Sequence, residues 1–594
     1  MLKKFFLNAL SAFVGAWAAI VLMIVAGVIF LFGIIGSFAQ KEGVSLSKGS
    51  VLVLKLKGEI EEVETAPVLD YSLMLKGKLS QPTTLNSIVK ALESGKNNSN
   101  IEALLIQCDG AIAAPATFDA IRRAVLDFKK SGKRVFAYGD SFTMGDYFVA
   151  TAADELFLNP CGNLDLQGIS GTSLYFKDFL DKIGISFEVV RVGTYKSAVE
   201  PFISNEMSEP ARLQLDSLYS QMWGYIRDGI ATSRKLQSSR IDSLVNRFIF
   251  LEDANAVLEN KLVDKCVYKR EVNSILAKYL GKDEKDVQYF PAENLAQMSD
   301  WGLAYGSKKQ IAVLYAVGDI AEFDGAGIYC EKLVPIITRL ADNENVKGLV
   351  LRVNSPGGSV FGSEQIGEAL DYFKSKGKKL AVSMGDYAAS GGYWISACAD
   401  RIFADPLSIT GSIGIFGLVP NAEGLTEKIG IHPQTVSTNP GVNFPSIFHP
   451  MSELQRDALQ KNVERGYDKF ISRVASGRNK SKEYIESIAS GRVWDAVTAR
   501  KLGLVDELGG LENAISWIAD KSQMGNSYEV AIYPKYEPGI LNLIPESVLQ
   551  NSVVSNVVER MKKEEFEEYA IQYAVWFLLQ NNVQARALDM RLNL

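Results

Sequence analysis

The segment that decides the fold is residues 385–406, GDYAASGGYWISACADRIFADP, because the chain contains a second copy of it. The other copy is residues 139–160, GDSFTMGDYFVATAADELFLNP, and 8 of the 22 aligned positions are identical. Chance alone would give about one identity over that length. The likeness extends upstream, where VLVLKLKGEI at 51–60 resembles IAVLYAVGDI at 311–320. The sequence therefore predicts a tandem duplication.

Each copy alternates short apolar runs with amphipathic stretches. The runs are rich in Val, Ile and Leu and end in Gly or polar residues, which is typical of buried parallel strands. They lie at residues 51–56, 101–107 and 133–139 in the first copy and at 311–317, 346–353 and 378–385 in the second. Helices are predicted between them, for example at 116–130 and 363–376. This order predicts two related α/β domains built from parallel βαβ units.

The N-terminus carries the pattern of a membrane anchor. Residues 5–40 contain no charged side chain, and an apolar stretch of about 20 residues is enough to span a bilayer as a helix. We expect one transmembrane helix over residues 10–36. Lys3 and Lys4 precede it, so the positive-inside rule places the N-terminus in the cytoplasm and the body outside.

Four parts are therefore expected along the 594 residues. They are a cytoplasmic N-terminus with the membrane helix (1–44), the first repeat (45–300), the second repeat (301–535) and a helical tail (536–594).

The composition excludes several classes of function. The formal net charge is −6 and is spread widely, which gives no basic surface for nucleic acid. The five cysteines are scattered without a C-x-x-C pair, so neither a zinc site nor a dense disulfide framework is expected, although one disulfide stays open. His432 and His449 are the only histidines, and a mechanism that needs histidine would have to use one of these two.

Two turns in the second copy present chemically useful groups. Ser390 lies between a predicted strand and a predicted helix and is flanked by small residues, which would let a substrate carbonyl approach its hydroxyl. The ordinary alternative is a helix N-cap, where serine is common. The turn at residues 356–358, Pro-Gly-Gly, exposes backbone amides that could hold a phosphate or an oxyanion. The chain has no G-x-x-x-x-G-K-[ST] motif, so a P-loop is excluded.

A serine nucleophile needs a base, and the scarcity of histidine favours lysine. A lysine becomes a base near neutral pH when burial lowers its pKa. Lys196 in the first copy, within GTYKSAVEPF, is the candidate; a surface lysine is the alternative. The counterpart of Ser390 in the first copy is Met144, and the only lysine between residues 411 and 450 is Lys428, which aligns with Lys182. The first copy thus lacks the serine and the second copy lacks the lysine. This predicts one composite site to which each copy contributes one residue.

These motifs resemble a known family. GTYKSAVEPF at 193–202 and ASGGYW at 389–394 are similar to the lysine and serine motifs of the long, two-repeat form of signal peptide peptidase A, in peptidase family S49. RVNSPGGS at 352–359 and TGSIG at 410–414 are similar to two further signatures. The resemblance covers nearly all of the body and includes the single N-terminal anchor, but no motif covers the last 50 residues.

The resemblance implies a crotonase-like, or Clp-protease-like, fold in each repeat and a serine protease with a Ser-Lys dyad. Ser390 would be the nucleophile and Lys196 the general base, with Ser412 hydrogen-bonded to the lysine. The oxyanion would be held by the amide of Gly358 or Gly357 together with that of Gly391. No metal and no other cofactor is implied.

The resemblance also implies remnant signal peptides and similar apolar peptides as substrates. It implies a homotetramer on the outer face of the bacterial cytoplasmic membrane. Three alternatives stay open: an acyl-CoA enzyme, since crotonase-like folds also use two amides to bind thioesters; a catalytically inactive membrane scaffold; and a protease of general membrane-protein quality control. The sequence also leaves open whether Lys196 meets Ser390 within one chain or between subunits.

Overall fold

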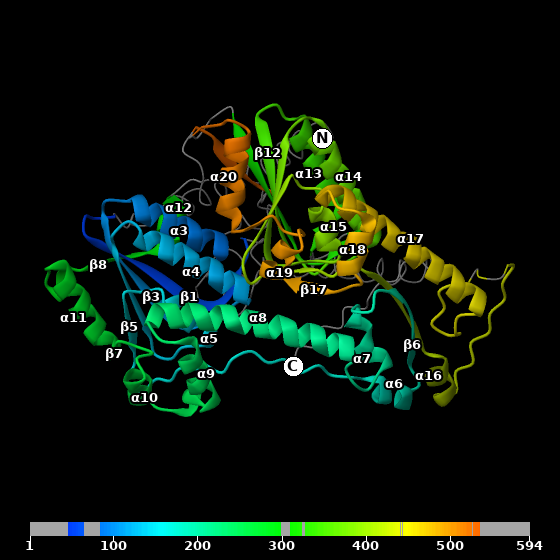
Figure 1. Cartoon of the computed structure of the whole chain (residues 1–594), viewed down its shortest axis with the longest axis horizontal. Helices are drawn as coiled ribbons and strands as arrows, with labels where there is room; N and C mark the ends of the chain where they lie inside the picture. The colour runs from blue at the N-terminus through cyan, green and yellow to red at the C-terminus, as the bar shows by residue number, and fades with distance from the viewer. Residues whose placement is uncertain are drawn as a thin grey trace, which may run out of the picture. The chain divides into compact units, whose positions relative to one another are not determined.

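Two largely parallel sheets, one from each repeat, organise this computed structural model (Figure 1). The structure describes residues 46–63, 83–298, 309–323, 327–439, 441, 443–525 and 527–534. The predicted membrane helix at 10–36 and the tail at 536–594 lie outside these ranges. Within them, no helix combines the length and the apolar character that crossing a bilayer requires.

The first sheet has the strand order β2-β1-β3-β4-β5-β7, and β8 also pairs with β1. Every pairing in it is parallel. Its strands are β1 (Ser50–Glu61), β2 (Thr83–Thr84), β3 (Ile101–Ile112), β4 (Arg134–Gly139), β5 (Glu155–Leu158), β7 (Lys265–Cys266) and β8 (Gln288–Pro291). The three strands expected from the sequence are therefore present as β1, β3 and β4.

Helices connect the parallel strands of the first repeat and extend beyond them. They are α3 (Leu85–Asn97), α4 (Pro115–Lys129), α5 (Met144–Ala150), α6 (Lys177–Ile183), α7 (Glu200–Ile203), α8 (Glu209–Arg234), α9 (Ser238–Asn246), α10 (Ala254–Glu259), α11 (Lys269–Leu280) and α12 (Ala292–Met298), with short 3₁₀ turns at Ser197–Val199, Ile249–Leu251 and Glu284–Asp286.

The second sheet has the order β17-β15-β13-β12-β9-β19, with β14 between β13 and β18. Only the pairing of β15 with β17 is antiparallel. Its strands are β9 (Gln310–Val317), β12 (Val346–Ser355), β13 (Lys379–Ala389), β14 (Arg401–Ala404), β15 (Ile409–Gly411), β17 (Val493–Asp495), β18 (Glu507–Leu508) and β19 (Glu529–Tyr533). A separate parallel pair is formed by β10 (Ile320–Ala321) and β11 (Ile328–Tyr329).

The helices of the second repeat follow the same scheme. They are α13 (Cys330–Asp342), α14 (Val360–Ser375), α15 (Gly391–Ser396), α16 (Glu423–Lys428), α17 (Glu453–Arg478), α18 (Lys482–Ile488), α19 (Ala496–Lys501) and α20 (Leu511–Lys521). The two 26-residue helices, α8 and α17, correspond: Ser208 and Ser452 cap their first turns. This alternation of strands and helices in both repeats confirms the predicted duplicated α/β class.

The second sheet is buried on both faces, which explains its continuous apolar strands. Along β9, Ile311, Val313 and Tyr315 pack in the core beneath α20, whereas Ala312 and Leu314 belong to the larger core on the opposite face. The alternation follows from the two-residue period of a strand.

One strand from each repeat also joins the two repeats in a separate two-stranded sheet. β6 (Ser186–Val192) of the first repeat pairs antiparallel with β16 (Ile415–Asn421) of the second, from Val192 opposite Ile415 to Ser186 opposite Asn421. Local alternation of apolar residues does not encode this pairing, because its partners lie more than 200 residues apart. It brings the segment that follows β6 to the second repeat.

Candidate active site

Ser390 lies at the point where β13 ends and α15 begins. The sequence placed the end of this strand near Met384, but the strand continues to Ala389, so that Ser390 follows it directly. Its backbone has φ 54° and ψ −119°, a conformation that costs energy for any residue with a side chain. The Ser390 N–H donates to the Gly411 carbonyl at 2.9 Å, which holds this strained turn against β15. The strained strand-to-helix turn lifts the hydroxyl out of the sheet, as at a nucleophile elbow.

Lys196 reaches Ser390 from the first repeat. It follows β6 after a turn at Gly193, and its N–H donates to the Gly193 carbonyl at 3.2 Å. Lys196 Nζ lies 3.0 Å from Ser390 Oγ, 2.9 Å from Ser412 Oγ and 3.0 Å from the Ser412 carbonyl oxygen. The structure thus brings together, within one chain, the three polar side chains that the sequence singled out.

The environment of Lys196 favours the neutral amine. The residue is only 5% exposed, and burial lowers its pKa to about 8. Among the described residues, Lys196 forms no ion pair with a carboxylate that would restore its positive charge. A neutral amine has two N–H groups and one lone pair. If the N–H groups are donated to the two Ser412 oxygens, the lone pair faces the Ser390 hydroxyl.

The three glycines named from the sequence lie together beside Ser390. A Cβ placed on Gly357 would be 2.7 Å from both the Gly391 nitrogen and Ser390 Cβ, and one on Gly391 would be 3.2 Å from the Gly358 nitrogen. The Gly357 N–H is already donated to Ser355 Oγ at 3.2 Å. Within the described residues, no hydrogen bond is found for the N–H of Gly358 or of Gly391. These two amides are therefore the pair that is free to hold an oxyanion.

A loop of the second repeat holds the lysine segment, a contact that was not predicted from the sequence. The Tyr195 N–H donates to the Ser490 carbonyl at 2.9 Å. Gly193 and Gly491 both have positive φ, and a Cβ on Gly491 would be 2.8 Å from Lys196 Cβ. The backbones therefore approach closely at a point where neither side offers room for a side chain. A glycine between a helix and a strand is too common to reveal this contact in advance.

The corresponding turn of the first repeat has no nucleophile. Met144 begins α5 there, and two residues later the Asp146 carboxylate accepts a hydrogen bond from the Gly110 N–H at 3.1 Å. Burial raises the pKa of Asp146 to about 6. Lys428, the lysine of the second repeat that aligns with Lys182, donates to the carbonyl oxygens of Asp181 and Lys182 instead. Asp146 therefore bonds within the first repeat, whereas Lys428 links the second repeat to the first.

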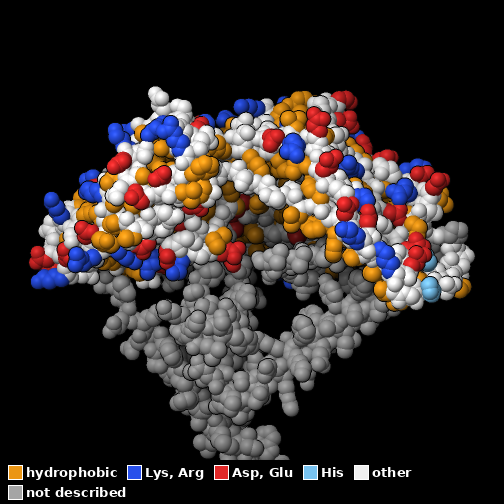
Figure 2. Space-filling view, turned by 90° about the horizontal axis from the view of Figure 1, so that it is seen from below, with side chains coloured by type: hydrophobic (Ala, Val, Ile, Leu, Met, Phe, Trp, Pro, Cys, Tyr) orange, Lys and Arg blue, Asp and Glu red, His pale blue; other side chains and the backbone are white. Residues whose placement is uncertain are grey.

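The described chain offers little for a metal or a redox group. No cluster of three or more His, Cys, Asp or Glu side chains in it is arranged to hold a metal ion. All five cysteines are free thiols, and His449 lies in an exposed loop beside Thr435. On the face shown in Figure 2, acidic and basic side chains are interspersed with apolar ones.

Comparisons with known proteins place these observations in a family. The family model described as peptidase family S49 matches residues 127–282 and 372–525, once in each repeat. Protease 4 of Haemophilus influenzae is 35% identical over 509 residues, covering 82% of each chain. Protease 4 of Salmonella typhi is 34% identical over 79% of this chain and 76% of its own.

More distant proteins also match. The chloroplastic serine protease SPPA of Arabidopsis thaliana is 27% identical over 84% of this chain and 74% of its own. Among solved structures, a mutant of ClpP1 from Listeria monocytogenes gives a TM-score of 0.24 at 16% identity, covering 34% of this chain and 94% of that one.

Proposed function

Because this chain belongs to peptidase family S49 and is a serine protease, we propose that Ser390 and Lys196 form its catalytic dyad. The observation that carries the proposal is the 3.0 Å distance between Ser390 Oγ and the buried Nζ of Lys196. A serine beside a lysine of lowered pKa is a nucleophile beside its base.

In the proposed reaction, Ser390 Oγ attacks the carbonyl carbon of a peptide bond while its proton passes to the neutral amine of Lys196. The negative charge on the carbonyl oxygen is held by the N–H groups of Gly358 and Gly391. The lysine ammonium then gives its proton to the leaving amine, and an acyl-enzyme ester remains on Ser390. Water, deprotonated by Lys196, hydrolyses this ester and restores the site. Ser412 keeps the amine pointed at Ser390 throughout.

The proposal extends to substrate and location. The enzyme is an endopeptidase that degrades remnant signal peptides and similar apolar peptides. It is anchored in the bacterial cytoplasmic membrane through residues 10–36, with its body on the outer side, and it works as a homotetramer of Clp-like repeats. Support comes from the apolar, uncharged N-terminus and from the motifs at 193–202 and 389–394. General quality control of membrane proteins is a second candidate, since the same dyad would serve it.

The decisive experiment is hydrolysis of a fluorogenic apolar peptide by the full-length protein. Wild type is compared with Ser390→Ala, with Lys196→Met and with a co-assembled mixture of the two variants. We expect each single variant to lose at least about 10³-fold in kcat/KM, because the two residues act as a unit. The mixture stays inactive, because both residues come from one chain. The exposed variant Lys177→Met is the control and keeps full activity.

Three outcomes would contradict the proposal. Activity retained in Lys196→Met would remove the lysine from the mechanism. Activity in the mixture would place the dyad between subunits. A wild-type protein that cleaves no apolar peptide, and is not labelled at Ser390 by a serine-reactive phosphonate, would favour an inactive scaffold.

A further inference from the structure

A cavity of about 340 Å³ lies between the repeats, away from Ser390. Its walls come from α3 and α4 of the first repeat and from β9, β12 and α20 of the second. This volume is within the range of small-ligand sites, about 300–1,000 Å³. Nothing in the proposed proteolytic mechanism uses the residues that line it.

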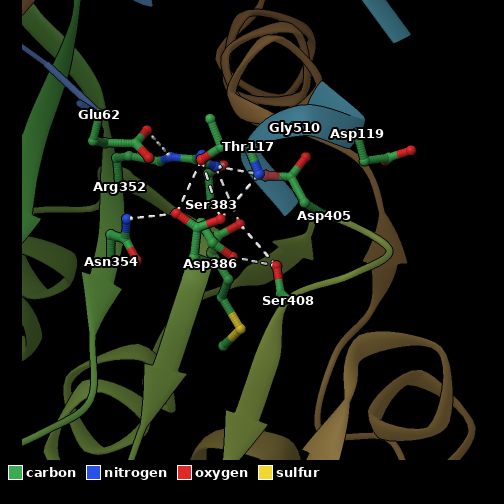
Figure 3. Close-up of polar contacts among 12 residues, drawn as sticks. Glu62, Thr117, Asp119, Arg352, Asn354, Ser383, Asp386, Asp405, Ser408 and Gly510 are labelled. Carbon is green, nitrogen blue, oxygen red and sulfur yellow. Dashed lines mark hydrogen bonds and ion pairs between the residues drawn. The ribbon is translucent and has the colours of Figure 1, made fainter. Parts of the chain in front are cut away.

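The positively charged side chains on the wall are already neutralised. Arg352 extends between two carboxylates (Figure 3). Arg123 and Lys96 are paired as well. The pairs are Arg352 with Glu62 (2.7 Å) and Asp405 (3.1 Å), Arg123 with Asp119 (2.8 Å) and Asp405, and Lys96 with Asp127 (2.7 Å). Among the described residues that line the cavity, a negatively charged ligand would therefore find no unpaired cation.

Hydrogen-bond acceptors, by contrast, are left over. Within the described part of the chain, Glu62 Oε2, Asn86 Oδ1 and the Tyr315 hydroxyl are buried without a hydrogen-bond partner, and all three residues line the cavity. The Glu62 side chain is only 4% exposed. Glu62 and Asn86 are neighbours in space, because the Asn86 N–H donates to the Glu62 carbonyl oxygen at 3.4 Å. Buried polar atoms are rarely left without a partner, so the Glu62 and Asn86 oxygens call for a donor, while the Tyr315 hydroxyl can donate or accept.

Glu512 adds a further negative charge to the wall. Within the described residues it forms no ion pair, and its Oε2 would lie 2.9 Å from a Cβ on Gly510, the same Cβ that would lie 3.4 Å from Arg123 Nη1 and 3.5 Å from Asp405 Oδ1. Burial raises the pKa of both Glu62 and Glu512 above the ordinary range of glutamate. Burial outweighs the nearby positive charges of Arg352 and Arg123, which lower the pKa of these carboxyl groups, so a further cation beside them would stabilise their charged forms.

We propose that this cavity binds a small organic cation, a primary ammonium or a guanidinium, that donates its N–H groups to Glu62, Asn86 and Glu512. A metal ion fits less well, since the described carboxylates are not grouped as metal ligands. An organic cation supplies several donors, which matches acceptors spread over two repeats. Because both repeats contribute to the wall, the ligand binds only the assembled pair and stabilises it.

Isothermal titration calorimetry with n-butylammonium chloride on the full-length protein tests this proposal without any protease assay. Butan-1-ol is the neutral probe of similar shape, and sodium chloride at equal ionic strength controls for screening. We expect saturable binding of butylammonium alone. Glu512→Gln and Asn86→Leu should each weaken it about tenfold or more, because each removes one acceptor. Glu209→Gln, an exposed carboxylate at the start of α8, should leave it unchanged.

Two results would overturn the proposal. One is the absence of saturable butylammonium binding up to 10 mM, which would mean that the cavity does not select an organic cation. The other is binding that is equal in wild type, Glu512→Gln and Asn86→Leu. Should Asn86→Leu fail to fold, the wild-type titration and Glu512→Gln still decide. A failure here leaves the proposed dyad untouched, because none of these residues contacts Ser390 or Lys196.

Discussion

The carboxylate of Asp386 accepts hydrogen bonds from both the N–H and the hydroxyl of Thr117, a residue of the other repeat. The N–H lies 2.9 Å from Oδ1, and the hydroxyl lies 3.1 Å from Oδ1 and 3.0 Å from Oδ2. Asn354 completes the shell with a bond to Oδ2 (Figure 3). Asp386 belongs to β13, four residues before Ser390, so this bond ties the strand that leads to Ser390 to the start of α4.

Thr117→Val tests the contribution of this contact to stability. The change keeps the shape of the side chain but removes one donor from a buried carboxylate. We expect the free energy of unfolding to fall by about 1.5–3 kcal/mol, the usual value for a hydrogen bond to a charged group. Urea unfolding followed by tryptophan fluorescence measures it. Thr338→Val, which removes a hydroxyl bonded only within α13, is the control and should cost under about 1 kcal/mol. Equal losses in both variants would mean that Asp386 gains nothing from Thr117.

The pH dependence of hydrolysis follows from the lowered pKa of Lys196. Only the neutral amine is a base, so kcat/KM should rise about tenfold per pH unit on the acid side and level off above about pH 8. The measurement is kcat/KM for an uncharged peptide between pH 5.5 and 9.5. An inflection near pH 10.4, the pKa of a solvated lysine, would show that burial does not lower the pKa of Lys196. A rate that falls across this range would exclude lysine as the base.

Ser412→Ala should slow the chemistry without weakening substrate binding. Without the hydroxyl, Lys196 Nζ keeps one bond to the Ser412 carbonyl and can rotate away from Ser390. We expect kcat to fall about 10- to 100-fold, with KM nearly unchanged, because one hydrogen bond to the amine is lost. Ser472→Ala removes an exposed hydroxyl on α17 and is the control. A change confined to KM would assign Ser412 to substrate binding instead.

Gly491→Ala should displace the base from the nucleophile. The added methyl group would meet Lys196 Cβ at 2.8 Å, so the lysine segment must move. We expect kcat/KM to fall at least about tenfold and the pH inflection to shift, because the surroundings of Nζ change. The matched control is Gly377→Ala, which has the same φ of +76° but open space around the new methyl group. Equal activity in the two variants would show that Gly491 does not position Lys196.

Much of this architecture could be predicted from the sequence, and the limits have a physical cause. The duplication, the strands β1, β3, β4, β9, β12 and β13, and the candidates Ser390 and Lys196 follow from local patterns and motifs, and Ser412 follows from the family resemblance. The pairing of β6 with β16 and the bond of Thr117 to Asp386 do not, because they depend on surfaces that meet only after both repeats have folded. The sequence left open whether Gly357 or Gly358 provides the oxyanion N–H. The structure favours Gly358, because the Gly357 N–H is donated to Ser355 Oγ.

Because β6 pairs with β16, the parts of this site are synthesised at different times. Lys196 leaves the ribosome first, Ser390 follows it, and the loop at Gly491 that holds the lysine comes 295 residues after Lys196. At about 5–20 residues per second, the two ends of this assembly are made roughly 15–60 s apart. A nascent chain therefore first contains Lys196 without Ser390. It then contains both residues, but without the loop at Gly491 that holds the lysine segment. If Ser390 and Lys196 form the proposed dyad, we expect proteolytic activity only when synthesis of the second repeat is nearly complete.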